Sequence, residues 1–165
     1  MASLLDEAAK LAAAQMAEQD GGGVGDLRSF LGAYYRQMPA EELIAAGPSR
    51  MAGVAAEHAR LAASRPQGRA LVQVSAGGMC SALEAQRGAV NIVTDDMPFL
   101  VDSITMELTR HGLDSFHIIH PQLLVRRDVT GTLWEVVGSL RDAKHAHDEI
   151  PESWTHIEID TSSGV

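Results

Sequence analysis

The residues best suited to chemistry in this chain gather at one acidic turn. The turn consists of Asp95, Asp96, Met97, Pro98 and Phe99. It separates an apolar, β-branched run at 89–94 from a run with helical spacing. A carboxylate before a helix can accept hydrogen bonds from the unpaired N–H groups of the first turn. Pro98 suits that position because its missing N–H would have had no partner there. The turn therefore predicts a strand-to-helix junction with Asp96 as the cap.

A second set of polar residues alternates along the last apolar run. It consists of His156, Glu158 and Asp160. On a strand all three would share one face, and their nitrogen and oxygen atoms could bind a metal ion. Residues two apart on a strand are too widely spaced to converge on one ion without a curled backbone. Because Ile157 and Ile159 would face the core, the preferred interpretation is a solvated polar face.

The remaining candidates carry weaker signals. His117 and His120 are three residues apart, which places them on opposite faces of a regular strand unless a bulge intervenes. Cys80 has no lysine near it in sequence, so a reactive thiol is not favoured. Arg126 and Arg127 could bind phosphate or an acidic partner, but such pairs more often protect a strand edge from aggregation.

The first part of the chain is expected to be helical, with a glycine-rich hinge at 21–25. Apolar residues recur at helical spacing, and Asp26, Pro39 and Gly47 mark helix ends. The expected helices are 3–19, 27–37, 39–47 and 48–64. The segment 65–68 is expected to be a linker, which places a domain boundary near residue 66.

The second part is expected to be rich in strands. Pro121 should interrupt one long strand, because proline cannot donate to a ladder. The expected elements are a strand at 70–74, a helical turn at 81–86, a strand at 89–94, a helix at 98–110, the interrupted strand at 115–127, a hairpin turn at 128–131, a strand at 132–140, a loop at 141–152 and a strand at 154–160. The helix at 98–110 should bury Ile104, so that Ile104→Ala would cost about 2–4 kcal/mol.

A strand that enters a helix through Asp-x-Pro is similar to the start of ACT domains, the small βαββαβ regulatory modules of amino-acid metabolism. Three longer blocks narrow the match: 94–108 (TDDMPFLVDSITMEL), 120–131 (HPQLLVRRDVTG) and 152–160 (ESWTHIEID). Together they resemble the N-terminal region of the very long-chain, NAD-specific glutamate dehydrogenases, over roughly residues 26–160.

This resemblance implies an α+β fold, with a helical segment at 1–66 and an ACT-like antiparallel sheet at 67–165 that is incomplete at its C-terminal end. It also implies a regulatory or assembly role within an oligomeric enzyme that converts glutamate to 2-oxoglutarate and ammonia. In ACT domains the first strand-to-helix loop often receives an amino-acid effector, so 95–99 is the expected effector site or interface. Phe99 departs from the glycine usual at its position and would fill the space that a ligand needs. A free-standing amino-acid sensor and a small metalloenzyme remain the alternatives.

Composition limits the function further. A net charge of −9 and a pI near 5.1 argue against nucleic acid and anionic membranes as partners. A single cysteine fits a reducing, cytoplasmic compartment. The chain lacks the glycine-rich turn after a strand that a nicotinamide-binding domain needs. We therefore expect no cofactor in this chain, with NAD bound elsewhere in a parent enzyme. Self-association is expected as well, because Ile157 and Ile159 would leave an apolar face partly uncovered.

Overall fold

The computed structural model describes residues 1–17, 23–75, 87–113, 115–142 and 146–160. Its helices and strands, in chain order, are α1 (Ala2–Ala17), α2 (Leu27–Tyr34), α3 (Ala40–Ala62), β1 (Leu71–Ser75), β2 (Arg87–Asp95), α4 (Leu100–Arg110), β3 (Ser115–Ile119), β4 (Gln122–Arg127), β5 (Leu133–Ser139) and β6 (Ile150–Asp160). The expected turn at 81–86, Cys80 and part of the glycine hinge lie outside the described residues.

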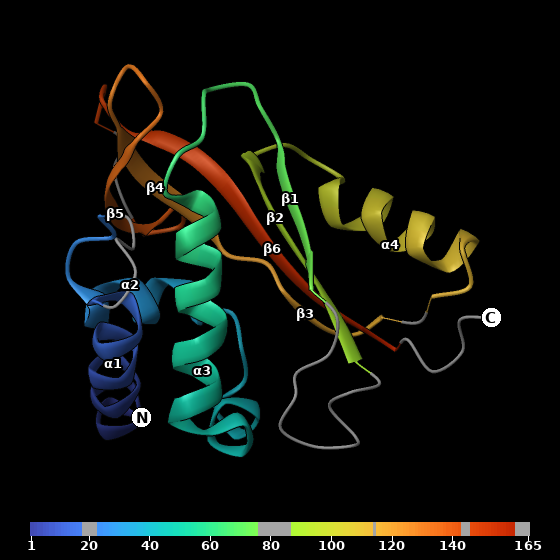
Figure 1. The fold of residues 1–165 in the computed structure, drawn as a ribbon, viewed down its shortest axis with the longest axis horizontal. Helices are drawn as coiled ribbons and strands as arrows, with labels where there is room; N and C mark the ends of the chain where they lie inside the picture. Colours follow the sequence, from blue (N-terminus) through green and yellow to red (C-terminus); the bar gives the residue numbers. More distant parts are fainter. Residues whose placement is uncertain (18–22, 76–86, 114, 143–145, 161–165) are drawn as a thin grey trace.

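The strands form one antiparallel sheet in the order β1-β2-β6-β4-β5, and β3 also pairs with β6 (Figure 1). The last strand in sequence is therefore the central one. It pairs with the whole length of β2 through residues 152–160, and β3 and β4 divide its other edge between them. The expected α+β, ACT-like fold is confirmed.

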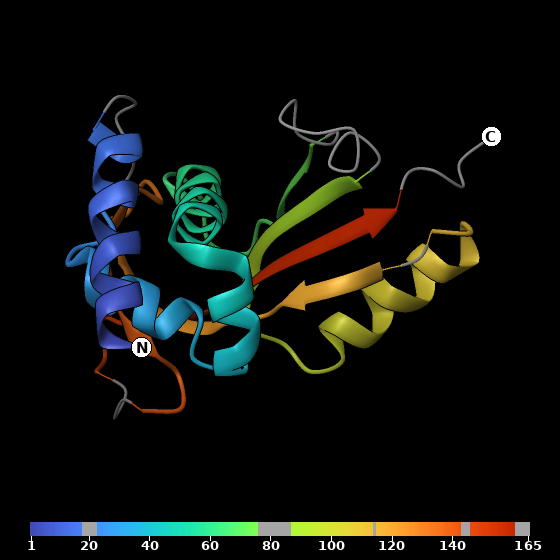
Figure 2. The same cartoon turned by 90° about the horizontal axis from the view of Figure 1, so that it is seen from below.

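Helices cover both faces of this sheet. The helices α1, α2 and α3 lie on one side and α4 on the other (Figure 2). On the α4 side, Ile104 and Leu108 pack against Ile157, Ile159 and their neighbours in β2. Ile157 is fully buried and Ile159 is 6% exposed. The expected uncovered apolar face at these two residues is therefore wrong, because α4 covers it.

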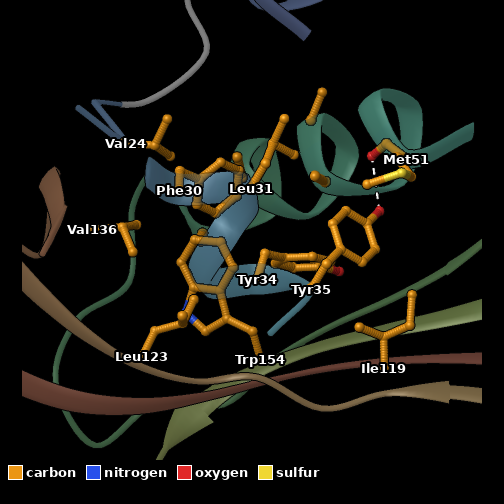
Figure 3. Close-up of a cluster of buried hydrophobic side chains, with 14 of the residues drawn as sticks. Val24, Phe30, Leu31, Tyr34, Tyr35, Met51, Ile119, Leu123, Val136 and Trp154 are labelled. Atoms are coloured by element: carbon orange, nitrogen blue, oxygen red, sulfur yellow. Dashed lines mark hydrogen bonds between the residues drawn. The ribbon is translucent and has the colours of Figure 1, made fainter. Parts of the chain in front are cut away.

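The larger core lies between the sheet and the N-terminal helices (Figure 3). The fully buried Trp154 of β6 meets Phe30 of α2 edge to face, with ring centroids 5.9 Å apart. Tyr35 lies farther along the same core and donates its hydroxyl to the Met51 carbonyl oxygen at 2.8 Å. The helical segment and the sheet thus share one hydrophobic core, while a folding boundary near residue 66 stays a prediction.

Two breaks in the elements match the expected ones. A single helical run, α3, is interrupted at Gly47, whose φ of 74° is non-helical and is followed by Pro48. Pro121 separates β3 from β4. The largest boundary difference is in β6, which begins at Ile150 rather than 154, because Ile150, Pro151 and Glu152 pair with β4 inside the region expected to be a loop.

The burial of α4 gives a first prediction. None of its residues is fully buried, although Ile104 and Leu108 contact the sheet as expected. We therefore expect Ile104→Ala to lower the free energy of unfolding by about 1–2 kcal/mol, less than the sequence suggests. Ser103→Ala, on the exposed side of α4, is the matched control. Urea titrations of both variants measure this, and equal losses at both positions would contradict the packing described here.

Candidate functional site

The acidic turn lies where β2 leaves the sheet. The residue that caps α4 is Phe99, in the left-handed conformation at φ 62° and without a side-chain cap. Asp96 accepts instead from the Gln122 side-chain nitrogen at 3.0 Å and from the Ser153 hydroxyl. Its own N–H donates to the Pro151 carbonyl oxygen at 3.1 Å, which extends the strand pairing. The predicted cap role of Asp96 is therefore wrong, because the neighbouring strands hold this residue on the sheet.

A polar cluster surrounds this carboxylate. It consists of Asp96, His120, Gln122, Ser153 and Thr155. The Nδ1 atom of His120 lies 2.9 Å from the Thr155 hydroxyl. Burial lowers the pKa of His120, and the charge of Asp96 opposes that shift. The amide, imidazole and carboxylate groups of the cluster are half-buried beside the turn, while the hydroxyl residues Ser153 and Thr155 are fully buried.

Two residues of the turn, Met97 and Phe99, face outward, whereas Asp95 bonds to the buried Arg65. Phe99 is 76% exposed and Met97 is 47% exposed. Burial of Phe99 in the core is thereby excluded. Phe99 and Met97 instead place two apolar side chains on the surface next to the polar cluster. Such an arrangement suits contact with another surface or with a small ligand.

A buried ionic network lies at the same end of these strands, on the opposite face of the sheet. Glu152 is fully buried and accepts hydrogen bonds from Arg65, from Arg127 and from the Trp154 indole. Arg65, also fully buried, bonds to Asp95 at 2.6 Å as well. Burial opposes the charge of Arg65, but Asp95 and Glu152 outweigh it and raise the pKa of Arg65.

This network corrects the interpretation of the arginine pair. The side chain of Arg127 is 2% exposed and bonded to Glu152, so it does not protect an edge. Only Arg126 lies near the surface, where it meets Glu135, Asp148 and Glu149. The signal available in the sequence was an acid at the start of an apolar strand, together with arginines at the ends of two other segments.

Two of the three alternating residues of β6, His156 and Glu158, are buried, whereas Asp160 at the end of the strand is half-buried. His156 is 3% exposed and Glu158 is 7% exposed, because α3 covers their face of the sheet. His156 Nδ1 lies 2.6 Å from the Asn91 side-chain oxygen, and Glu158 pairs with Arg50 of α3. Burial raises the pKa of Glu158, but the contacts with His156 and Arg50 outweigh it and lower that pKa to about 2.

The histidines take separate partners. His117 lies 3.8 Å from Glu42, while His120 belongs to the polar cluster. Among the residues that the structure describes, no group of three His, Cys, Asp or Glu side chains is placed to bind a metal ion. A further buried histidine is His58 of α3, fully enclosed between Tyr34, 2.8 Å from its Nδ1 atom, and the Ile92 carbonyl oxygen, 3.1 Å from its Nε2 atom.

The antiparallel sheet, the helix that follows β2 and the two-sided covering define an ACT-like α+β domain. The family model of the glutamate dehydrogenase ACT1 domain matches residues 30–164, so the chain belongs to this family.

A curated relative, the NAD-specific glutamate dehydrogenase of Pseudomonas aeruginosa, is 41% identical over 73 residues. The match covers 44% of this chain and only 4% of that relative. No solved structure matches the chain. No helix among the described residues is long and apolar enough to cross a membrane.

Proposed function

We propose that this chain is the regulatory or assembly N-terminal region of an NAD-dependent glutamate dehydrogenase and is not catalytic in itself. The single observation that carries the proposal is the match to the glutamate dehydrogenase ACT1 domain over residues 30–164. The relative's name supports glutamate as substrate and NAD as cofactor of the parent enzyme, which we propose to be cytoplasmic. Its partners would be further copies of the chain and the remaining domains of the enzyme.

The sheet gives physical support for a non-catalytic role. Dinucleotide-binding folds hold the pyrophosphate at the carboxyl ends of parallel strands, beside a glycine-rich turn. The strands described here are all antiparallel. The turn from β2 into α4 offers carboxylates and Phe99 where a pyrophosphate would need glycines.

We therefore expect the isolated chain to have no affinity for NADH and no dehydrogenase activity. Titration with NADH, followed by nucleotide fluorescence, should show no saturable change up to millimolar concentration. A glutamate dehydrogenase with an intact dinucleotide-binding domain is the positive control. Saturable binding in the sub-millimolar range would overturn the non-catalytic assignment.

An amino-acid sensor is the second candidate, and the polar cluster beside the 95–99 turn favours it. The α-amino and α-carboxylate groups of a free amino acid need hydrogen-bonding partners of both kinds. Asp96 offers an acceptor and the Gln122 side-chain amide can donate or accept, and both residues are half-buried. Calorimetry with a panel of amino acids tests this, with Asp96→Asn as the variant that should abolish any heat observed. If no amino acid produces binding heat, the sensor function is excluded and only the assembly role remains.

A further inference from the structure

The two aspartates of the acidic turn bond to opposite faces of the sheet. Asp95 bonds to Arg65, just beyond the end of α3, on the face that α1, α2 and α3 cover (Figure 2). Asp96 bonds to Gln122 and Ser153 on the face where α4 lies. Adjacent residues of one turn are thus attached to the two different layers of helices.

The Arg65 guanidinium connects the turn to the buried part of the domain. The side chain of Asp95 is 38% exposed, whereas that of Arg65 is fully buried. The Nη2 atom of Arg65 lies 2.6 Å from Asp95 Oδ1 and 2.6 Å from Glu152 Oε1, so the two carboxylates share it. The guanidinium therefore has two arrangements, one between both carboxylates and one held by Glu152 alone when Asp95 is drawn away.

The backbone at Arg65 packs directly against the hairpin at 128–132. The Arg65 N–H donates to the Gly131 carbonyl oxygen at 2.9 Å, and the Leu133 N–H donates to the Ala63 carbonyl oxygen at 2.9 Å. A side-chain carbon on Gly131 would lie 2.5 Å from the Arg65 carbonyl oxygen, closer than non-bonded atoms approach. Because no space separates the two segments, a shift of Arg65 must move the hairpin as well.

We propose that Asp95 transmits a change at the 95–99 turn through Arg65 to the end of α3 and to the 128–132 hairpin, whereas Asp96 acts on the α4 side alone. A hydrogen bond between charged groups contributes more than a neutral one, and more still when one partner is buried. The inference deepens the regulatory role proposed above and rests on it for its purpose. An effector or a neighbouring domain at the turn would reach the N-terminal helices by this route.

Hydrogen exchange of the 165-residue chain, followed by NMR, tests this coupling with Asp95→Asn. Asparagine keeps the size of the side chain and one acceptor oxygen but removes the charge. We expect the Arg65 and Leu133 amide protons to exchange about tenfold faster, because Arg65 loses a charged hydrogen bond. The Val136 amide proton, which bonds to Val24 farther along β5, is the internal reference and should change much less.

The matched control is Asp96→Asn, the same substitution at the next residue. It should leave exchange at Arg65 and Leu133 unchanged. It should instead accelerate exchange of the Leu140 amide proton, which donates to the Gln122 carbonyl oxygen at 2.9 Å. Equal acceleration at Leu133 in the two variants would overturn the separation of the two aspartates.

A second background tests whether Arg65 carries the effect. Arg65→Met keeps an unbranched apolar stem and removes the guanidinium, while Glu152 retains Arg127 as its partner. In this background Asp95→Asn should have no further effect on the Leu133 amide proton. A remaining acceleration would show that the coupling does not pass through Arg65. If Arg65→Met does not fold, the comparison of the two asparagine variants decides the question.

Unchanged exchange at Arg65 and Leu133 in Asp95→Asn would overturn the coupling. Equal acceleration at Val136 would overturn it too, because it would indicate a general loss of stability. NADH binding by the isolated chain would instead overturn the non-catalytic role and leave the coupling intact, so the two proposals fail separately.

Discussion

Replacing Glu152 by alanine should lower the free energy of unfolding by about 3–5 kcal/mol, the usual cost of removing one partner from a buried ion pair. Glu152 is the shared acceptor of Arg65 and Arg127, and the side chains of all three residues are at most 2% exposed. Its loss would leave Arg65 with Asp95 as its carboxylate partner and Arg127 with backbone carbonyl oxygens. It would also remove the acceptor of the Trp154 indole.

The matched control for this variant is Glu135→Ala. Glu135 also pairs with an arginine, Arg126, but its side chain is 46% exposed. Solvent screens such a pair, so the free energy of unfolding should barely change. Denaturant titration followed by tryptophan fluorescence measures both variants. Similar losses at the two positions would show that the buried network does not stabilise the fold as its geometry implies.

Acidification from pH 7 to pH 5 should cost the folded chain about 2 kcal/mol through His58 alone. Burial lowers the pKa of this imidazole to about 3, since the Ile92 carbonyl only partly offsets it and His156 adds to the shift. An unfolded histidine titrates near 6.5. Between these values the unfolded chain binds more protons than the folded one, so stability is present above the unfolded pKa and is lost as the pH falls.

The comparison variant is His58→Gln, whose side chain can donate to Ile92 and accept from Tyr34 without titrating near neutral pH. Its free energy of unfolding should depend less on pH between 7 and 5, whatever its value at pH 7. His120, whose pKa is also lowered by burial, adds loss of the same sign in both proteins and does not affect their difference. Parallel pH profiles of the two proteins would contradict a buried, neutral His58.

The order of elements was predictable because its signals are local. Gly47 marks a break because glycine readily adopts a left-handed backbone. Pro121 marks a break because proline cannot donate to a ladder. The helical spacing of the apolar residues in α4 likewise predicted which side of this helix packs on the sheet.

The candidate site was less predictable because its partners are distant in sequence. An alternating strand has the same pattern whether its polar face meets water or a second layer of helices, and only Arg50 of α3 distinguishes the two for Glu158. Asp96 resembled a helix cap, but Ser153, 57 residues away, binds its carboxylate instead. Arg65 and Glu152, 87 residues apart, leave no periodic signal at all.

The central place of β6 has a consequence for synthesis of the chain. Before residues 150–160 emerge from the ribosome, β2 can pair only with β1, and β4 only with β5. The nascent polypeptide would therefore hold two separate strand pairs, with the acceptor for Arg65 and Arg127 still missing. Arrival of β6 joins the pairs, neutralises the buried arginines and gives the N-terminal helices a complete sheet to cover. Folding of this unit should thus wait for residues 150–160, and a ribosome stalled before Ile150 should carry a chain that proteases cut readily.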